Sequence, residues 1–424
     1  MSKFTSSLSR NTILAYVVLA LLMLGAMRVF ENPRHPSLRW LITYVSGAAN
    51  YEFGQGWRFN ENDVTLFQEI PTWEGRTAHR TEPSDPEQLI SWKGTTKGYL
   101  FVILLARTLF PWMGDLDSVL ALQQIVHILV TIAVSLAFST TRRRVAFCVL
   151  FGLNPLILHI VTYPYYYYWQ SIPSAFLVAH LVKRDLKFGR YAFLLAILLS
   201  GIYVVRPTIL FLSVVLFALI FLRESRVVAC GALALFLLLA IPVLGGNDHS
   251  KDPWHTAYTG VGAYPNPYGL TFRDFEGNAL FERKTGRKFD QGVGGDVYHR
   301  PEVRAEYSRY EKEAFLEIAR EHPFMVLRNA TLNFFQAFSI GYVNASLSVS
   351  YLSSLTGLGF LGLLLWQKRW GFAIAIAAAS PFVIFSPPVH IYMFGGYILI
   401  VAAAVEVLGE RVEPWLEARA ARAR

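Results

Sequence analysis

Long apolar runs separated by short basic clusters dominate this chain and restrict its fold more than any single motif does. A helix needs about 20 apolar residues to cross a bilayer, where its backbone must satisfy its own hydrogen bonds. The pattern predicts an all-α, polytopic membrane helix bundle with about 10 spans. The predicted spans are roughly 12–30, 118–139, 145–162, 171–182, 191–205, 208–222, 227–244, 349–366, 371–386 and 391–408.

The composition agrees with this class. Of the 424 residues, 54% are hydrophobic and 16% are charged, whereas a soluble protein carries about 25% charged residues. A formal charge of +9 would favour nucleic acid in a soluble chain. Here the basic residues mark loop ends, so we expect no nucleic-acid partner. Cys148 and Cys230 lie inside apolar runs and indicate neither a disulfide framework nor a metal site.

The basic clusters predict the orientation, because Lys and Arg favour the cytoplasmic side of a membrane. Placing Arg142–Arg144, Lys183–Arg190 and Lys368–Arg369 in the cytoplasm puts both termini inside and two long segments outside. The chain then divides into three parts. They are an N-terminal transmembrane module (1–244) with a first exterior loop (31–117), an exterior loop with interfacial helices (245–348), and C-terminal transmembrane helices with a cytoplasmic tail (349–424).

Both exterior segments contain predicted helices. The stretches 99–112, YLFVILLARTLFPW, and 324–338, FMVLRNATLNFFQAF, are too short to span and indicate juxtamembrane helices lying in the outer interface. Another helix is predicted from Pro301 to Glu321. Proline is favoured at the first position of a helix, as at Pro301, and a proline just after the last turn, as at Pro323, ends a helix. The stretch 245–272, which contains DPWHTAYTGVG, is interpreted as a loop.

Five tyrosines and a tryptophan crowd into the seven positions from Tyr163 to Trp169. Such rings have an apolar body and a polar tip, so they collect at membrane–water boundaries. The cluster lies at the outer end of the third predicted span. It is either an interfacial aromatic belt or a surface that stacks on a sugar or a polyprenyl chain. In the second case the substrate-lining residues are Tyr165, Tyr166, Tyr167, Tyr168, Trp169 and Gln170.

The order of several motifs resembles the GT-C superfamily of membrane glycosyltransferases, which includes the bacterial aminoarabinose and protein mannosyl transferases. The stretch TTKGYLFVILLARTLF (95–110) is similar to that family's first-loop segment, FGLNPLILHIVTYP (151–164) to its third span, and GIYVVRPTIL (201–210) to its Arg-Pro-Thr junction. REHPFMVLRNATLNFF (320–335) is similar to the close of its exterior loop. The resemblance covers about the first 225 residues well and the rest loosely.

The resemblance implies a multi-pass glycosyltransferase of a bacterial inner membrane, with its active site facing the periplasm. Such an enzyme moves a sugar from a polyprenyl-phosphate donor to a glycolipid, polysaccharide or protein acceptor. No nucleotide site is expected, because the donor is lipid-linked, and a divalent metal ion is left open. The alternatives are a polymerase or ligase of lipid-linked glycans, a transporter or flippase, and a non-catalytic subunit of a glycan assembly system.

The chain departs from the family's pattern at its acidic positions. Many members carry Asp-Glu early in the first exterior loop. In this chain the pair would fall near Trp40 and Leu41, which cannot accept a proton. A second acid often follows the third span, and Gln170 stands there. The usual catalytic carboxylates therefore cannot be carried over.

Inverting transfer from a lipid phosphate needs a base for the acceptor hydroxyl and cations for the departing phosphate. Glu52, beside a glycine pair, and Asp63 are the candidate catalytic bases, with Glu52 favoured; a solvated loop carboxylate is the alternative for both. Arg206, just before Pro207, is the candidate phosphate ligand, since a guanidinium fork suits phosphate, and Lys97 can join it. Snorkelling to lipid headgroups is the alternative for Arg206.

Aromatic and imidazole side chains in the second exterior segment suit carbohydrate. Trp254 and Tyr258 are candidate lining residues. His255 between them is either an acceptor base or a structural histidine. His390, at the outer end of the last span, is a further candidate.

Overall fold

The computed structural model describes residues 10–30, 39–60, 63, 69–70, 73–91, 98–244, 253–289 and 301–422. The chain is 75% helical, which confirms the all-α prediction. Sheet structure in the described residues is limited to two short strands, β1 (Arg58–Phe59) and β2 (Ile90–Ser91), paired antiparallel.

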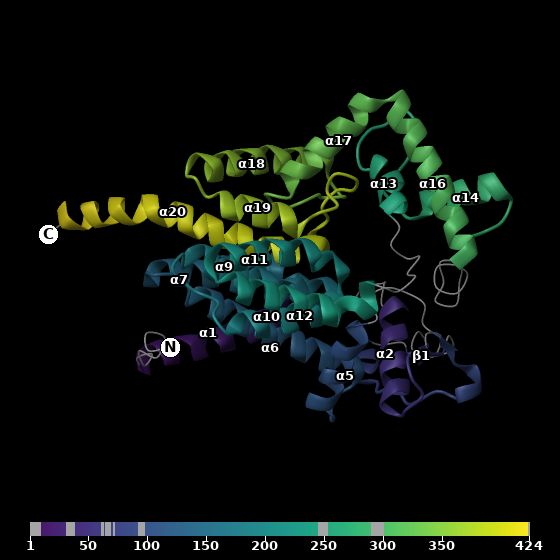
Figure 1. The fold of residues 1–424 in the computed structure, drawn as a ribbon, viewed down its shortest axis with the longest axis horizontal. Helices are drawn as coiled ribbons and strands as arrows, with labels where there is room; N and C mark the ends of the chain where they lie inside the picture. Colours follow the sequence, from purple (N-terminus) through teal and green to yellow (C-terminus); the bar gives the residue numbers. More distant parts are fainter. Residues whose placement is uncertain are drawn as a thin grey trace.

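Apolar helices run roughly along the long axis of the molecule and form the bundle (Figure 1). Each predicted span corresponds to a helix; in the third, a π-helical turn at Cys148–Gly152 continues α7, and the span is broken just before Pro155. The bundle helices are α1 (Arg10–Val29), α6 (Asp115–Ser135), α7 (Thr141–Phe147), α8 (Pro155–Val161), α9 (Ser171–Val182), α10 (Tyr191–Val205), α11 (Leu210–Arg223), α12 (Arg226–Leu244), α18 (Leu347–Trp366), α19 (Trp370–Ala379) and α20 (Phe394–Arg422).

Fewer helices than predicted are long enough to cross a membrane. Among the described residues, four qualify by length and composition: α1, α6, α18 and the segment His390–Trp415; the α7–α8 pair, bent by 57°, would be a fifth. The prediction of about 10 spans therefore exceeds what helix length supports. Prolines explain part of the difference, because Pro207 follows the end of α10 and Pro381 follows the end of α19. The 10 residues of α19 reach only about 15 Å, half of a bilayer core.

The bundle has an aromatic interior and an apolar exterior. Phe147 stacks on Phe151, which in turn contacts Phe394 of α20, and all three side chains are fully buried. On the outside, Leu194 of α10 and Leu238 of α12 are 62% and 64% exposed. An apolar outer face of this kind suits contact with lipid.

The two long segments lie at one end of the bundle, to the right in Figure 1, whereas both termini lie at the other end. The first segment contains α2 (Arg39–Glu52), α4 (Trp73–Ala78), the 3₁₀ turn Pro86–Gln88 and α5 (Tyr99–Leu109). The second contains α13 (Pro253–Val261), α14 (Phe275–Thr285), α16 (Pro301–Glu321) and α17 (Pro323–Gln336).

The local predictions in these segments had mixed outcomes. Helix α16 has the predicted bounds, and α5 and α17 occupy the predicted juxtamembrane stretches; their placement at a membrane interface stays a prediction. The loop predicted at 245–272 is wrong over Pro253–Val261, which is helical. Pro253 begins this helix, and Ala257, Tyr258 and Val261 form one buried face that joins a small core with Phe315 of α16.

Candidate functional site

A cavity of about 610 Å³ opens where the bundle meets the second long segment. Its wall comes from the tyrosine-rich turn after α8, the α10–α11 junction, the start of α13 and the connection between α19 and α20. Most of this wall is apolar, with prolines, phenylalanines and leucine. A few polar side chains converge on it, which is the usual composition of a small-molecule site.

Among the described residues that line this wall, Arg206 is the only arginine or lysine, and it lies at the junction between α10 and the 3₁₀ turn Pro207–Ile209. Its Nη2 donates a hydrogen bond to the Tyr167 hydroxyl. Its guanidinium lies 3.9 Å from the centre of the Tyr167 ring and 4.9 Å from that of Tyr166. Its Nε is buried and makes no hydrogen bond. Among the described residues, no carboxylate lies within ion-pair distance of its guanidinium.

Two further polar atoms in the cavity wall lack partners. The Nε2 of Gln170 donates to Thr208 Oγ1 at 3.0 Å, but its Oε1 is buried without a hydrogen bond. The Oγ of Ser380 is also buried and unbonded. Buried polar atoms are nearly always hydrogen-bonded in folded proteins. Three such atoms belong to residues that line one cavity, and one of them is on a cation, so this wall is the candidate site for a ligand with polar groups.

The tyrosine cluster divides between the cavity and the core. The rings of Tyr165, Tyr166 and Tyr167 lie 4.4–5.0 Å apart, and Tyr392 continues the series 4.4 Å from Tyr167. Tyr168 is instead buried against the bundle. The chain forms a 3₁₀ helix from Tyr166 to Gln170, so successive side chains point about 120° apart.

Of the six lining residues predicted here, Tyr167 and Gln170 reach the cavity wall. Trp169, like Tyr168, is buried, at 7% exposed. Tyr165 and Tyr166 support Tyr167 from behind by stacking.

The predicted bases occupy separate networks in the first long segment. Glu52 ends α2 and accepts a hydrogen bond from Arg107 Nε at 2.9 Å, while Arg107 also pairs with the buried Asp115. Asp63 accepts hydrogen bonds from Ser46 and, at 2.9 Å, from Ser84. Neither acid belongs to the cavity wall. Their contacts hold α2 in place, and a catalytic role for them stays a prediction. Lys97 lies outside the described residues.

His255 lies on α13 between two carboxylates. Its Nδ1 is 2.7 Å from Glu311 Oε1, and its Nε2 is 3.3 Å from Asp274 Oδ1. Burial lowers the pKa of His255, but hydrogen bonds to Asp274 and Glu311 outweigh it and raise the pKa to about 10. The ring therefore keeps both protons at neutral pH and donates to both acids. This state favours the structural alternative over an acceptor base.

The other predicted residues of the second segment face its own core. Tyr258 is buried beside Phe315, and Trp254 packs on the same cluster. Pro253 and Thr256 of the same helix reach the cavity instead. His390, the remaining predicted residue, lies outside this segment, just before α20. Its Nδ1 is 2.9 Å from the hydroxyl of Tyr397, which donates a hydrogen bond to the carbonyl of Ile340.

Sequence analysis missed several residues that the fold brings to the site. Ser380, Phe382 and Tyr392 line the cavity, and all lie in SPFVIFSPPVHIY (380–392), where serines and prolines interrupt two apolar runs. That interruption was a usable signal. Asp274 was also missed: its side chain is 77% exposed, and its Oδ1 lies 3.3 Å from His255 Nε2. The hydrogen bond from His255 holds the pKa of Asp274 below its ordinary value, so this acid is ionised.

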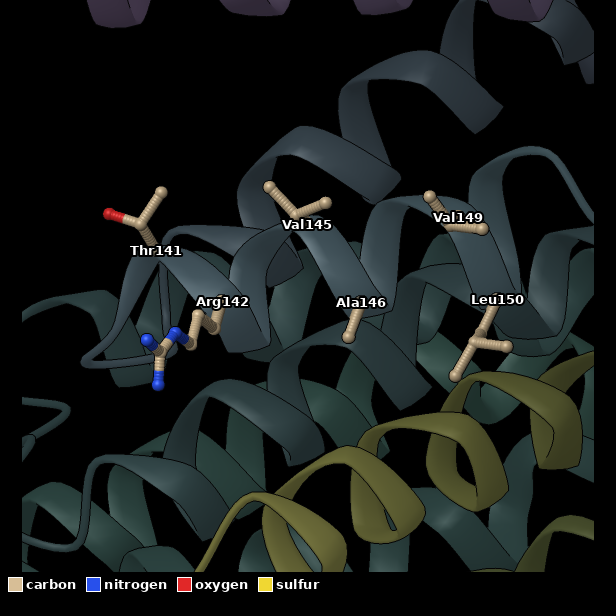
Figure 2. Close-up of a pocket in the computed structure, with 6 residues that line it drawn as sticks. All are labelled: Thr141, Arg142, Val145, Ala146, Val149 and Leu150. Atoms are coloured by element: carbon tan, nitrogen blue, oxygen red, sulfur yellow. The ribbon is translucent and has the colours of Figure 1, made fainter. Parts of the chain in front are cut away.

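A second hollow of about 580 Å³ lies on the outside of the bundle along α7 and the π-helical turn (Figure 2). Figure 2 shows its lining side chains coming from this single stretch, with Thr141 and Arg142 at one end and Val149 and Leu150 at the other. The hollow has no converging polar groups, which suits lipid contact. Among the described residues, no cluster of three or more His, Cys, Asp or Glu could hold a metal ion.

No model of a known protein family, no curated protein and no solved structure matches this chain. The functional conclusion therefore rests on the cavity around Arg206.

Proposed function

We propose that this protein is an integral membrane glycosyltransferase of the GT-C kind, which takes a sugar from a polyprenyl-phosphate donor. The observation that supports the proposal is Arg206, a partly buried cation that has no carboxylate of the described residues beside it and that borders a largely apolar cavity. A partly buried cation without an anion is unfavourable, and a bound phosphate lowers that cost. The apolar wall fits the other part of the same ligand, its prenyl chain.

Several polar and aromatic groups of the cavity have a role in this reaction. The acceptor hydroxyl attacks the anomeric carbon, the bond from that carbon to the phosphate oxygen breaks, and the electron pair stays on the phosphate. Arg206 stabilises that growing charge, which is the largest electrostatic change along the reaction. The rings of Tyr167 and Tyr392 offer stacking faces for the sugar, and Gln170 Oε1 and Ser380 Oγ bind its hydroxyls.

The acceptor proton needs a carboxylate. Glu52 and Asp63 remain candidates from the sequence, although both are engaged in networks away from the cavity wall. Asp274 is a third candidate, because it is ionised and exposed. In the proposal, the end of the bundle that carries these acids faces the periplasm of a bacterial inner membrane, and the shorter apolar helices complete about 10 membrane passes.

The alternatives use the same cavity differently. A polymerase or ligase would bind a diphosphate-linked oligosaccharide, and a flippase would move a lipid phosphate without breaking a bond. A non-catalytic subunit would bind the lipid only. The transferase is favoured over a flippase because the cavity lies at one end of the bundle beside the long polar segments, whereas carriers place their sites near mid-membrane.

The test measures lipid binding by the purified full-length protein in nanodiscs. Undecaprenyl phosphate is compared with undecaprenol, which has the same chain and no phosphate. Arg206→Ala should weaken phosphate binding roughly tenfold to a hundredfold, since a hydrogen bond to a charged group contributes about 1.5–3 kcal/mol. Arg206→Lys should lie in between, because it keeps the charge and loses the planar fork. Arg142→Ala, an exposed arginine beside the outer hollow, is the matched control.

Equal affinity for the phosphate and the alcohol would overturn the proposal, as would normal binding by Arg206→Ala. Sugar transfer is then measured in a deletion strain complemented with each variant and normalised to membrane abundance. Binding without any transfer would favour the flippase or the non-catalytic subunit.

A further inference from the structure

We infer that a buried row of polar side chains on α6, centred on His127, binds a file of water molecules inside the bundle and carries protons between the cavity and the opposite end of the bundle. The four residues Gln123, His127, Thr131 and Ser135 form this α6 polar row. The inference goes beyond the proposed function, because no step in it depends on a lipid donor or a sugar.

The α6 polar row runs along a helix that is long and apolar enough to cross a membrane. Its members stand at every fourth position, so they share one helix face, and each is 0% exposed. From Gln123 to Ser135 the helix rises about 18 Å, which is more than half of a bilayer core of roughly 30 Å. Polar residues at this depth are unfavourable for packing alone, and they mark proton and ion pathways in membrane proteins.

His127 has a fixed tautomer because the third predicted span is broken beside it. In a continuous helix the Gly152 carbonyl would accept from the N–H of Leu156. Here that N–H bonds to Asn154 Oδ1 at 3.0 Å, and Pro155 has no N–H to offer. The Gly152 oxygen lies 3.3 Å from His127 Nε2 instead. Since a carbonyl only accepts, Nε2 carries the proton, and Nδ1 is left as an acceptor.

Three atoms of the row have no hydrogen-bond partner within the part of the chain that the structure describes. They are His127 Nδ1, Thr131 Oγ1 and Gln123 Oε1. The amide nitrogen of Gln123 donates to the carbonyls of Val161 and Tyr163 at 2.7 Å and 2.8 Å, which identifies its oxygen as the free acceptor. Buried polar atoms without protein partners are generally bonded to ordered water, and these three lie on consecutive turns of one face. We therefore expect several water molecules in a file.

The first turn of α20 lies between the row and the tyrosine-rich turn. The ring of Phe394 is 6.5 Å from the ring of His127 and 4.8 Å from that of Tyr168. The Tyr168 hydroxyl is buried and makes no hydrogen bond to any described residue. It adds a free polar atom beside the row, in a turn that forms part of the cavity wall.

Next to Phe394, Gly395 brings two further polar side chains together. A Cβ at Gly395 would lie 2.9 Å from Gln170 Cβ and 3.0 Å from Ser174 Oγ, so a larger residue does not fit without displacing them. Ser174 Oγ and Gln170 Oε1 are both buried without a hydrogen bond among the described residues, and Gln170 lines the cavity. Free polar atoms therefore continue from the cavity wall towards His127.

The other end of the row reaches α1. Ser135 Oγ and the hydroxyl of Tyr16 are 2.8 Å apart, and Tyr16 is partly exposed. In Figure 1 this end of the bundle carries both termini, whereas the long segments beside the cavity lie at the opposite end. The row and its neighbours thus lead from the cavity through the bundle.

A proton crosses His127 without any change in the bond to Gly152. Nδ1 accepts a proton from a water molecule on the cavity side, which leaves the ring doubly protonated, and then returns it to a water molecule on the Thr131 side. The hydroxyls of Thr131 and Ser135 and the water molecules each accept one proton and donate another. Only O–H and N–H bonds form and break, and every group ends with the number of protons it began with.

The first experiment measures whether the row is hydrated. In a Cys148→Ala, Cys230→Ser background, which removes both native thiols, Thr131→Cys is placed in the row. Val130→Cys, its buried apolar neighbour, is the matched control. The full-length protein in nanodiscs is treated with silver ion, which is close to water in size, and the thiols that remain are labelled after denaturation. We expect silver to protect Thr131→Cys from the label and to leave Val130→Cys unprotected.

The second experiment measures proton entry into proteoliposomes that hold a pH-sensitive dye. The wild type is compared with His127→Gln, which offers an amide donor to Gly152 but cannot take up a proton. Ser200→Ala is the control, because Ser200 Oγ is buried in α10 and bonded to the carbonyls of Ala196 and Phe236 at 2.7 Å and 3.2 Å. We expect His127→Gln to reduce proton entry to the level of liposomes without protein, and Ser200→Ala to match the wild type.

Each experiment can overturn its part of the inference. Silver protection at both positions or at neither overturns the water file. Proton entry through His127→Gln at the wild-type rate overturns transfer through His127, as does wild-type entry no faster than that of liposomes without protein. Neither experiment uses a lipid phosphate, so the inference and the proposed function fail separately.

Discussion

Two arginines in different parts of the bundle have opposite environments. Arg143 of α7 pairs with Glu406 Oε1 at 3.3 Å and Glu413 Oε2 at 2.9 Å, and its side chain is 13% exposed. Glu406 also lies 3.8 Å from Arg369. Arg206, by contrast, has aromatic rings in place of carboxylates and borders a cavity.

The difference separates an arginine that stabilises the folded protein from one that is available to bind a ligand. The ion pairs around Glu406 join α7, the α18–α19 connection and α20, and both arginines have carboxylate partners. Around Arg206 the folded protein retains a buried donor with no acceptor. Such a site is unfavourable for folding alone, so we expect stability to depend on the first region and ligand affinity on the second.

The largest expected effect concerns which side of the membrane each region faces. Asp85→Cys, in the first long segment, should react with an impermeant thiol reagent in intact cells, and Arg142→Cys, beside Arg143, should react only after permeabilisation. Both residues are exposed, and both variants are made in the Cys230→Ser background. Labelling restricted to Arg142→Cys in intact cells would reverse the orientation and move the cavity to the cytoplasm.

Removal of the shared carboxylate tests the stabilising region. Glu406→Gln leaves Arg143 and Arg369 without their common partner, so the protein should lose about 3 kcal/mol of stability. The loss is measured as earlier thermal denaturation in detergent, with lipid-phosphate affinity unchanged below that temperature. Glu410→Gln, whose side chain is 45% exposed, is the control and should lose less than about 1 kcal/mol. Equal effects of the two changes would remove the distinction between the regions.

The pH dependence of stability tests whether His255, like Arg143, is a cation held by carboxylates that stabilise the fold. Its folded-state pKa, about 10, is raised above the ordinary value of about 6.5. The stabilisation is therefore complete below pH 6.5 and is lost as the pH rises towards 10. Thermal denaturation of the wild type should occur at progressively lower temperature over that interval, and His255→Asn should flatten the profile. A wild-type profile as flat as the variant's would show that the two carboxylates do not hold the proton.

The smallest expected effect compares two serines. Ser380 Oγ in the cavity is unbonded, whereas Ser353 Oγ of α18 donates to the Gly341 carbonyl at 2.8 Å. Ser380→Ala should keep the denaturation temperature and weaken donor binding several-fold, by about 1 kcal/mol. Ser353→Ala should do the reverse, with lower stability and normal binding. Normal binding by Ser380→Ala would remove this hydroxyl from the ligand site.

Local signals account for the parts of the structure that could be predicted. Helix α16 was predictable at both ends because Pro301 and Pro323 delimit it within the sequence itself. Helix α13 was missed because its aromatic and glycine content suggested a loop, and its helical face becomes favourable only against Phe315. Fewer helices than predicted are long enough to span, because apolar runs continue past the prolines at which helices such as α19 end.

The candidate site shows the same division. The sequence by itself determined that the chain is helical and apolar, that tyrosines gather just before Gln170, and that an arginine stands at the end of an apolar helix. These are properties of neighbouring residues. Only the tertiary structure decided that Arg206 meets Tyr167 with no described carboxylate beside it, that Glu52 pairs with Arg107, and that Phe211 meets Phe382. Whether a polar atom stays unpaired depends on side chains that arrive from distant parts of the chain, and only packing brings those together.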